Sequence, residues 1–166
     1  MDITKLHAGD IVKYSGIIYT ARDQAHLRLK EMIDNNQEIK IDFKDSFIYY
    51  AGPTPTRPGE QIGSIGPTTS SRMDKFISYM KILGVKGMIG KGPRDKSVKE
   101  TCKNDKIVYF VTTGGAGALL SKCVIESSEV MFNDLGCESI KKLYVKDFPL
   151  IVAYDIYGND VFERNK

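Results

Sequence analysis

Two segments of the chain repeat the order of a strand, a glycine-containing loop and a helix. The first leads from a β-rich stretch at residues 85–89 through the loop GKGP to a helical stretch at 96–103. The second leads from the strand-like residues 107–111 through a loop with three glycines to an apolar pair. Units of this kind pack as parallel strands flanked by helices. We therefore predict an α/β fold, a mixed sheet with flanking helices, whose loops gather ligands at the carboxyl ends of the strands.

Other parts of the chain carry shorter signals of secondary structure. Alternating polar and apolar residues indicate strands, and apolar residues at a spacing of three or four indicate helices. These patterns predict a hairpin over 10–20 with its turn at Ser15-Gly16, a helix over 21–33 capped by Asp23, a strand over 47–51, a loop over 52–66, a helix over 73–83 and closing β-structure over 143–160.

Composition limits the classes of protein. The length of 166 residues suits one domain, which we expect to span residues 1–166. The net charge of +3 without a basic tract argues against nucleic-acid binding. No apolar run is long enough to span a membrane, and the N-terminus does not resemble a secretion signal. We therefore expect a cytoplasmic protein. The three cysteines lack ligand spacing, so we expect buried thiols and no metal site on this chain.

The segment GPTTSSR (66–72) combines the features of an anion site. Gly66 permits a close approach, four consecutive hydroxyl side chains follow, and Arg72 stands in the first turn of the expected helix. The N-terminus of a helix stabilises a carboxylate, and an arginine can bind it through two parallel hydrogen bonds. An ordinary Ser/Thr helix cap is the simpler explanation of the hydroxyls, and the residues alone leave both open.

Three further groups of residues bear on chemistry. Lys91 lies between two glycines after a strand, where it can meet an anion or serve as a solvated turn residue. The GGAG run at 114–117 lacks the dinucleotide-binding spacing, so we interpret it as a tight strand-to-helix turn. Arg22, Asp23 and His26 cluster at a helix entry, where a local Asp–His hydrogen bond is a simpler expectation than a catalytic dyad.

Five runs of the sequence, taken in order, resemble the C-terminal domain of class I fumarases and the β subunit of two-subunit fumarases and tartrate dehydratases. The resemblance covers nearly the whole chain, and the GPTT-x-x-RMD pattern is its most specific part. The runs are ARDQAH (21–26), YYAGP (49–53), GPTTSSRMD (66–74), GKG (90–92) and DFP (147–149).

The resemblance implies a swivelling β/β/α domain that works with a larger α subunit, as a heterodimer or heterotetramer. That partner would hold a cysteine-ligated 4Fe-4S cluster, which acts as a Lewis acid on the substrate. By motif, Arg22, Arg72 and Lys91 would bind the carboxylates of a small dicarboxylate, with Gly66 beside them. Thr68 would be the base at C3 of malate, and Lys91 would share in catalysis.

The implied reaction is the reversible hydration of fumarate to (S)-malate. Ser70 and Ser71 stand where fumarases often have alanine and glycine, which leaves dehydration of L-tartrate to oxaloacetate as an alternative. The runs at 145–149 and 157–162 look more like fumarases. A non-catalytic anion-binding module and an independent enzyme for phosphorylated substrates are the rival expectations from other classes.

Overall fold

The computed structural model describes residues 1–112 and 116–163. Its helices are α1 (Asp23–Asp34), α2 (Ile77–Ile82), α3 (Lys96–Asp105) and α4 (Gly117–Ser121), with 3-10 helices η1 (Ile3–Lys5), η2 (Ser70–Phe76) and η3 (Asn133–Glu138). Its strands are β1 (Ile11–Thr20), β2 (Phe47–Tyr49), β3 (Gly87–Gly90), β4 (Val108–Val111), β5 (Val124–Met131) and β6 (Ile140–Tyr154).

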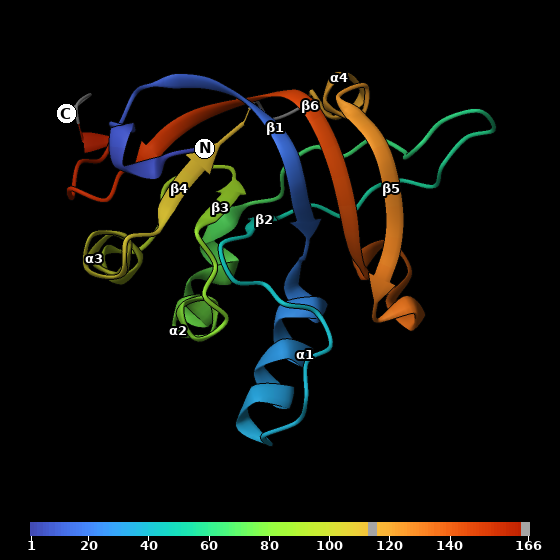
Figure 1. Cartoon of the computed structure of the whole chain (residues 1–166), viewed down its shortest axis with the longest axis horizontal. Coiled ribbons are helices and arrows are strands. Elements are labelled where there is room, and N and C mark those ends of the chain that lie inside the picture. Colours follow the sequence, from blue (N-terminus) through green and yellow to red (C-terminus); the bar gives the residue numbers. More distant parts are fainter. Residues whose placement is uncertain (113–115, 164–166) are drawn as a thin grey trace.

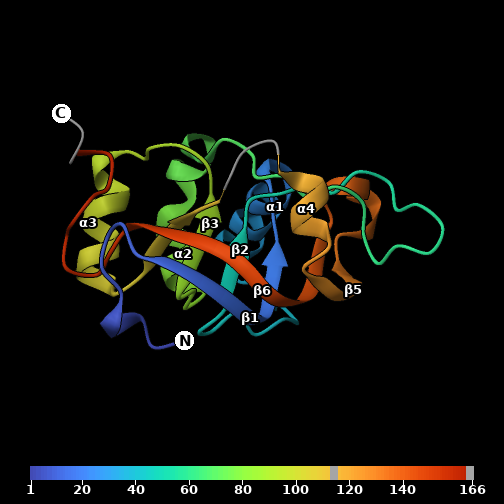
Figure 2. The ribbon, with the colours of Figure 1, turned by 90° about the horizontal axis from the view of Figure 1, so that it is seen from above.

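The strands form a closed ring. β1, β2, β3 and β4 run parallel to one another, and the long β6 pairs antiparallel with both β4 and β1. β5 pairs antiparallel with the first residues of β6, on the side of β6 opposite β1, and β1 and β6 lie side by side in both views (Figures 1 and 2). The predicted α/β class with a mixed sheet and flanking helices is therefore confirmed.

Two apolar cores lie on the two faces of β2–β4. Phe47, Tyr49 and Phe110 face the interior of the ring, where they meet residues of β1 and β6. Ile48 and Tyr109 face the other way, toward the core that includes α1, α2 and α3. Figure 1 shows these three helices on one side of the central strands. Because these strands are buried on both faces, their sequences are continuous apolar runs and do not alternate between polar and apolar residues.

The hairpin predicted over 10–20 is wrong, because these residues form the single strand β1. Its pairing with β6 continues on both sides of a bulge between Tyr14 and Gly16. Gly16 has φ +149°, and a Cβ there would lie 2.6 Å from the Tyr14 hydroxyl. The Ser15-Gly16 pair therefore marks a bulge, the irregularity that glycine often signals inside a strand. The closing β-structure is likewise one strand, β6, and the exposed strand β5 was not predicted.

The remaining predictions, on helix ends and cysteine burial, are confirmed only in part. The residue before α1 is Arg22, and Asp23 makes no capping bond. The helix predicted over 73–83 is divided into η2 and α2. Cys102 is buried as expected, whereas Cys137 is exposed. Of the glycine loop predicted at 114–117, residues 114 and 115 lie outside the described residues. Within the described ranges, no helix is long and apolar enough to cross a membrane.

Candidate active site

The carboxyl ends of the four parallel strands bring the candidate residues to one edge of the sheet. Arg22 follows β1, Gly52 follows β2 and Lys91 follows β3. Because parallel neighbours end at the same edge, residues from distant parts of the chain meet there. The loops that follow β1, β2 and β3 therefore meet at one edge of the sheet, and that they gather a ligand there stays a prediction.

The segment 66–72 crosses this edge and is fixed to it by backbone bonds. The Thr68 amide donates to the Tyr50 carbonyl at 2.8 Å, and the Ser70 amide donates to the Lys91 carbonyl at 3.0 Å. The buried Ser70 hydroxyl accepts from the Lys91 amide at 2.8 Å. Thr69 and Lys91 are partners in an isolated parallel bridge. These bonds hold the segment against the residues that follow β2 and β3, and they place the Lys91 backbone next to Thr69.

Arg72 joins two of the predicted features through one guanidinium group. Its Nε and Nη2 donate to the two Asp23 carboxylate oxygens at 2.9 and 3.2 Å, and Nη2 also donates to the Thr68 hydroxyl at 2.8 Å. Hydrogen bonding from Arg72 holds the pKa of the Asp23 carboxyl below its usual range. Asp23 thus fixes the orientation of Arg72, and the expected Asp23–His26 pair is wrong because Asp23 bonds to Arg72 instead.

Thr68 receives a hydrogen bond from a cation, and this has a chemical consequence. Since Arg72 occupies a lone pair of the Thr68 oxygen, the hydroxyl hydrogen is left to point at another group. A neighbouring positive charge also favours the oxygen in its negatively charged form. The arrangement can therefore pass a proton through Thr68 Oγ1 more readily than an isolated threonine can.

Arg22 offers an unused donor at the same edge. Its Nε is buried and has no hydrogen-bond partner among the described residues. The side chain lies against Gly52, where an added Cβ would come within 2.8 Å of Arg22 Cδ. A buried donor without a partner is costly, and an anionic ligand is one group that would satisfy it. The absence of a side chain at Gly52 is what lets Arg22 lie there.

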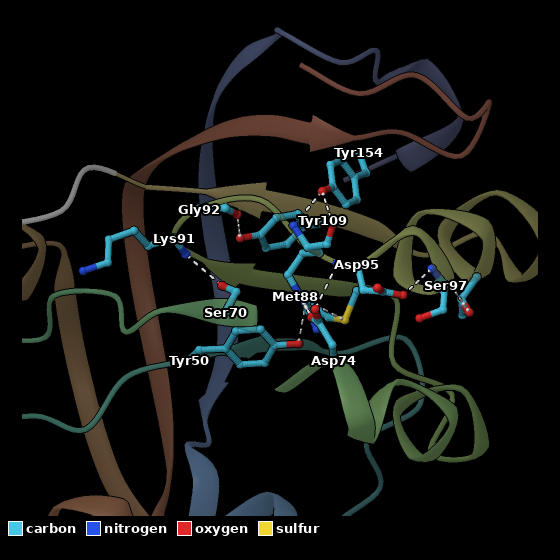
Figure 3. A network of polar contacts seen from close by, with 12 residues as sticks. Tyr50, Ser70, Asp74, Met88, Lys91, Gly92, Asp95, Ser97, Tyr109 and Tyr154 are labelled. Carbon is cyan, nitrogen blue, oxygen red and sulfur yellow. Dashed lines mark hydrogen bonds and ion pairs between the residues drawn. The ribbon is translucent and has the colours of Figure 1, made fainter. Parts of the chain in front are cut away.

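Hydrogen bonds hold the Lys91 backbone, whereas its ammonium group makes no hydrogen bond or ion pair with the residues that the structure describes. Its side chain is exposed and extends away from the Ser70 hydroxyl and from the polar network beyond it (Figure 3). No contact joins Lys91 directly to Arg72 or Arg22, so the described structure brings these three cations to one edge without placing them in mutual contact. A ligand with two negative charges suits three cations at one edge.

Gly66 lies two residues before Thr68 and packs on Gly117 of α4. A Cβ at Gly66 would lie 3.7 Å from the Gly117 Cα, which is ordinary contact. The fold alone therefore does not require glycine at this position. We expect Gly66→Ala to change the free energy of unfolding by less than about 0.5 kcal/mol, while lowering catalytic efficiency at least tenfold if a ligand approaches the backbone here. Thermal denaturation and steady-state kinetics would separate the two effects.

His26 lies directly behind this edge. Its Nδ1 bonds to the Arg22 carbonyl at 2.7 Å, so Nδ1 carries the hydrogen, and its buried Nε2 has no partner among the described residues. The ring packs against Tyr50 and Phe76. Burial lowers the pKa of His26 from 6.5 to about 4. The neutral ring therefore supports the backbone of Arg22 and takes no direct part in proton transfer near neutral pH.

This burial predicts a specific acid sensitivity. Between pH 6.5 and 4 the unfolded chain protonates His26 but the folded chain does not, so stability is complete above pH 6.5 and is lost as the pH falls. The loss should reach about 3 kcal/mol at pH 4. Denaturant unfolding at a series of pH values would measure it. Replacing the exposed His7 by glutamine should leave the slope intact, whereas His26→Gln should remove it; equal slopes in both variants would contradict the assignment.

Sequence reasoning missed two polar residues of this region, Asp74 and Arg94, and it counted Ser70 among the hydroxyls of the anion site. Ser70 is fully buried and bonds to the Lys91 amide, so of the two serines only the exposed Ser71 can meet a ligand. Asp74 and Arg94 form a buried ion pair behind the loops. Asp74 stood in the specific RMD pattern and Arg94 directly follows GKGP, which were the available signals. The helix expected at Arg72 is a 3-10 helix, so the predicted α-helical N-terminus is absent.

The described residues do not form a metal site or a cluster site. No group of three His, Cys, Asp or Glu side chains in the ranges 1–112 and 116–163 could hold a metal ion. Burial raises the pKa of the Cys102 thiol to about 12, which disfavours the thiolate that a metal needs. A cavity of about 580 Å³ lies between α3 and the C-terminal segment, but none of the predicted site residues lines it. Arg72 instead lines a more open hollow of about 550 Å³ with Asp23, Ser71 and Asp74, on the surface that carries the candidate residues.

Comparison with protein families gives this surface a context. The family described as fumarase C-terminus matches residues 1–165. The chain belongs to this family. An Escherichia coli protein named fumarate hydratase class I, aerobic, is 40% identical over 152 residues, which cover 90% of this chain and 28% of that protein. The chain therefore spans less than a third of that relative.

Two relatives of similar length carry a different name. A Methanocaldococcus jannaschii protein with the provisional name L(+)-tartrate dehydratase subunit beta is 41% identical over 169 residues, covering 98% of this chain and 87% of that protein. The Escherichia coli L(+)-tartrate dehydratase subunit beta is 34% identical over 170 residues, covering 99% and 83%. The predicted relation to both branches of the family is confirmed, and these named relatives are hydro-lyases or their subunits.

Proposed function

We propose that this chain is the β-type, substrate-binding part of an iron-sulfur hydro-lyase that reversibly hydrates fumarate to (S)-malate. Residues 1–166 would form one swivelling domain that closes on a larger α subunit in the cytoplasm, as a heterodimer or heterotetramer. The observation that carries the proposal is the hydrogen bond from Arg72 to Thr68 at an edge that also holds Arg22 and Lys91. This bond links a cation that can bind a substrate carboxylate to a hydroxyl group that can donate or accept a proton.

In this proposal the chain binds the dianion and handles one proton. Arg22, Arg72 and Lys91 hold the two carboxylates, and the buried Nε of Arg22 gains the partner it lacks. Thr68 Oγ1 delivers a proton to C3 during hydration and removes it during dehydration. The 4Fe-4S cluster that the family resemblance implies would belong to the α subunit and would supply a Lewis acid for the substrate hydroxyl.

Tartrate is the second candidate substrate. The two relatives of similar length described above, which align over 87% and 83% of their length, are named as L(+)-tartrate dehydratase β subunits, the first of them provisionally. Ser71 is exposed beside Arg72 and can hydrogen-bond an additional hydroxyl, which tartrate has and malate lacks. Dehydration would then yield oxaloacetate and water.

The test is reconstitution with an α subunit under anaerobic conditions. The complex should hydrate fumarate, followed by its absorbance, and the isolated chain should be inactive. Parallel assays with L-tartrate and meso-tartrate would identify the preferred substrate. Activity of the isolated chain in air would contradict a shared site. Dicarboxylate binding without turnover by any complex would favour a non-catalytic anion-binding module.

Replacing Thr68 separates proton transfer from binding. We expect Thr68→Val to lower kcat at least a hundredfold while KM changes little, because the carboxylate-binding cations stay in place. Thr68→Ser keeps the hydroxyl that accepts from Arg72 and is the matched control, expected to retain most of kcat. An unchanged kcat in Thr68→Val would remove Thr68 from the reaction.

A further inference from the structure

A buried ion pair lies directly behind the candidate site. The Arg94 side chain is 0% exposed and the Asp74 side chain 17% exposed, and Arg94 Nε bonds to one Asp74 oxygen. The other oxygen accepts from the Asp95 amide at 2.9 Å. Figure 3 shows Asp74 within a polar network that reaches from Tyr50 to Tyr154. Both carboxylate oxygens are therefore engaged, and the carboxylate has a single orientation.

The guanidinium group of Arg94 is held equally firmly. It lies 5.1 Å from the ring centroids of both Tyr50 and Tyr109, and its Nη1 donates to the Tyr50 hydroxyl at 3.1 Å. The Arg94 amide donates to the Tyr154 hydroxyl at 2.7 Å, and that hydroxyl donates to the Arg94 carbonyl at 3.1 Å. These contacts therefore fix both the side chain and the backbone of Arg94.

Stability alone does not account for this arrangement. Burying an ion pair costs desolvation, and well-packed apolar residues of similar volume often stabilise a fold as well or better. The Nη2 of Arg94 is moreover buried without a hydrogen-bond partner among the described residues, which is a further cost. What an ion pair supplies that an apolar pair does not is a fixed direction and distance between two backbone segments.

The two segments that the pair joins both carry candidate site residues. Asp74 lies two residues after Arg72, and Arg94 lies three residues after Lys91. The same segments are already joined once by the reciprocal bonds of Ser70 and Lys91, at 2.8 and 3.0 Å. Two separate connections therefore set the position of the 66–74 segment relative to the 90–94 segment.

We propose that Arg94 and Asp74 are positioning residues that hold Arg72 and Lys91 at a fixed separation, matched to the two carboxylates of a four-carbon dicarboxylate. The identity of this ligand rests on the proposed function, whereas the connection between the segments does not. Without the ion pair the two cations move independently, and the site loses its preference for the length of the diacid.

Hydrogen exchange in the isolated chain tests the connection without any substrate. In Arg94→Met and Asp74→Asn, the Ser70 amide that bonds to Lys91 should exchange at least tenfold faster, while amides of β1 and β6 keep their protection. Arg94→Lys, which keeps the charge, should restore part of the protection. Leu143→Ala is the matched control, because Leu143 is 0% exposed in β6 and belongs to the other core. An unchanged exchange rate of the Ser70 amide in both Arg94→Met and Asp74→Asn would overturn the proposal that the ion pair connects the two segments.

Inhibition of the reconstituted complex tests the separation of the cations. Saturated diacids of four and five carbons are compared as competitive inhibitors of the wild type and of Arg94→Met, Asp74→Asn and Leu143→Ala. The ratio of the two inhibition constants should fall at least fivefold toward 1 in the Arg94 and Asp74 variants and stay unchanged in Leu143→Ala. A lower melting temperature with an unchanged ratio and kcat/KM would overturn a positioning role. If the wild-type complex acts on no dicarboxylate, the proposed function fails and the exchange experiment alone decides the inference.

Discussion

Arg72→Gln is expected to lower kcat/KM of the reconstituted complex by about a thousandfold, or about 4 kcal/mol of transition-state binding. The reason is that one guanidinium serves two groups, since it bonds to both oxygens of Asp23 and to the Thr68 hydroxyl. Glutamine removes the charge that a substrate carboxylate meets. It also removes the donor that prepares Thr68 for proton transfer, so both KM and kcat should change.

Two variants make this result specific. Arg72→Lys keeps the charge but cannot make the same set of directed bonds, so it should recover only part of the loss. Arg28→Gln is the matched control, because Arg28 is also a partly exposed arginine of this chain that bonds to both oxygens of an aspartate, Asp134. It should leave kcat/KM within about twofold of wild type. Equal kinetics for Arg72→Gln and wild type would exclude Arg72 from the site.

The local patterns of the sequence predicted the elements but not how the ring closes. The strands before GKGP and before the glycine loop at 112–118 could be predicted because strand, loop and helix follow one another directly. The closure by β6 could not, since its pairing with β1 joins Ile11 to Ile151 and Thr20 to Lys141 across most of the chain. Pairing over such separations depends on tertiary packing, which the local alternation of residues does not encode.

The same distinction applies to the candidate site. The GPTT-x-x-RMD pattern contains both Thr68 and Arg72, so the family resemblance named them together as candidates, although Thr68 lies before η2 and Arg72 within it. Their partners are remote in sequence: Asp23 precedes Arg72 by 49 residues, and Arg94 follows Asp74 by 20. A local pattern made Asp23 look like a helix cap or a partner of His26. The bond that Asp23 makes depends on which strand ends are neighbours, and only the folded sheet determines that.

Gly90 gives the largest expected effect on stability. It ends β3, and a Cβ there would lie 1.8 Å from the Ser70 hydroxyl oxygen, 3.1 Å from the Ser70 Cβ and 2.9 Å from Tyr50 Cδ2. Ser70 is fully buried and bonded to the Lys91 amide, so it cannot simply turn away. We expect Gly90→Ala to cost about 3 kcal/mol of unfolding free energy, as overpacking does in a tightly filled core. Thermal and denaturant unfolding would measure the loss.

A second substitution tests whether Ser70 is the cause. Ser70→Gly alone should also destabilise the chain, because the Lys91 amide loses its partner. Combined with Gly90→Ala, however, it removes two of the three atoms that the new methyl group meets, so the double variant should be more stable than the sum of the single losses predicts, by about 1–2 kcal/mol. Gly66→Ala is the control, since its Cβ meets only ordinary contact. Additive losses would mean that the clash of the new methyl group with Tyr50, and not its clash with Ser70, causes the destabilisation. Contact between Ser70 and Gly90 would then not limit how closely the 66–74 and 90–94 segments approach each other.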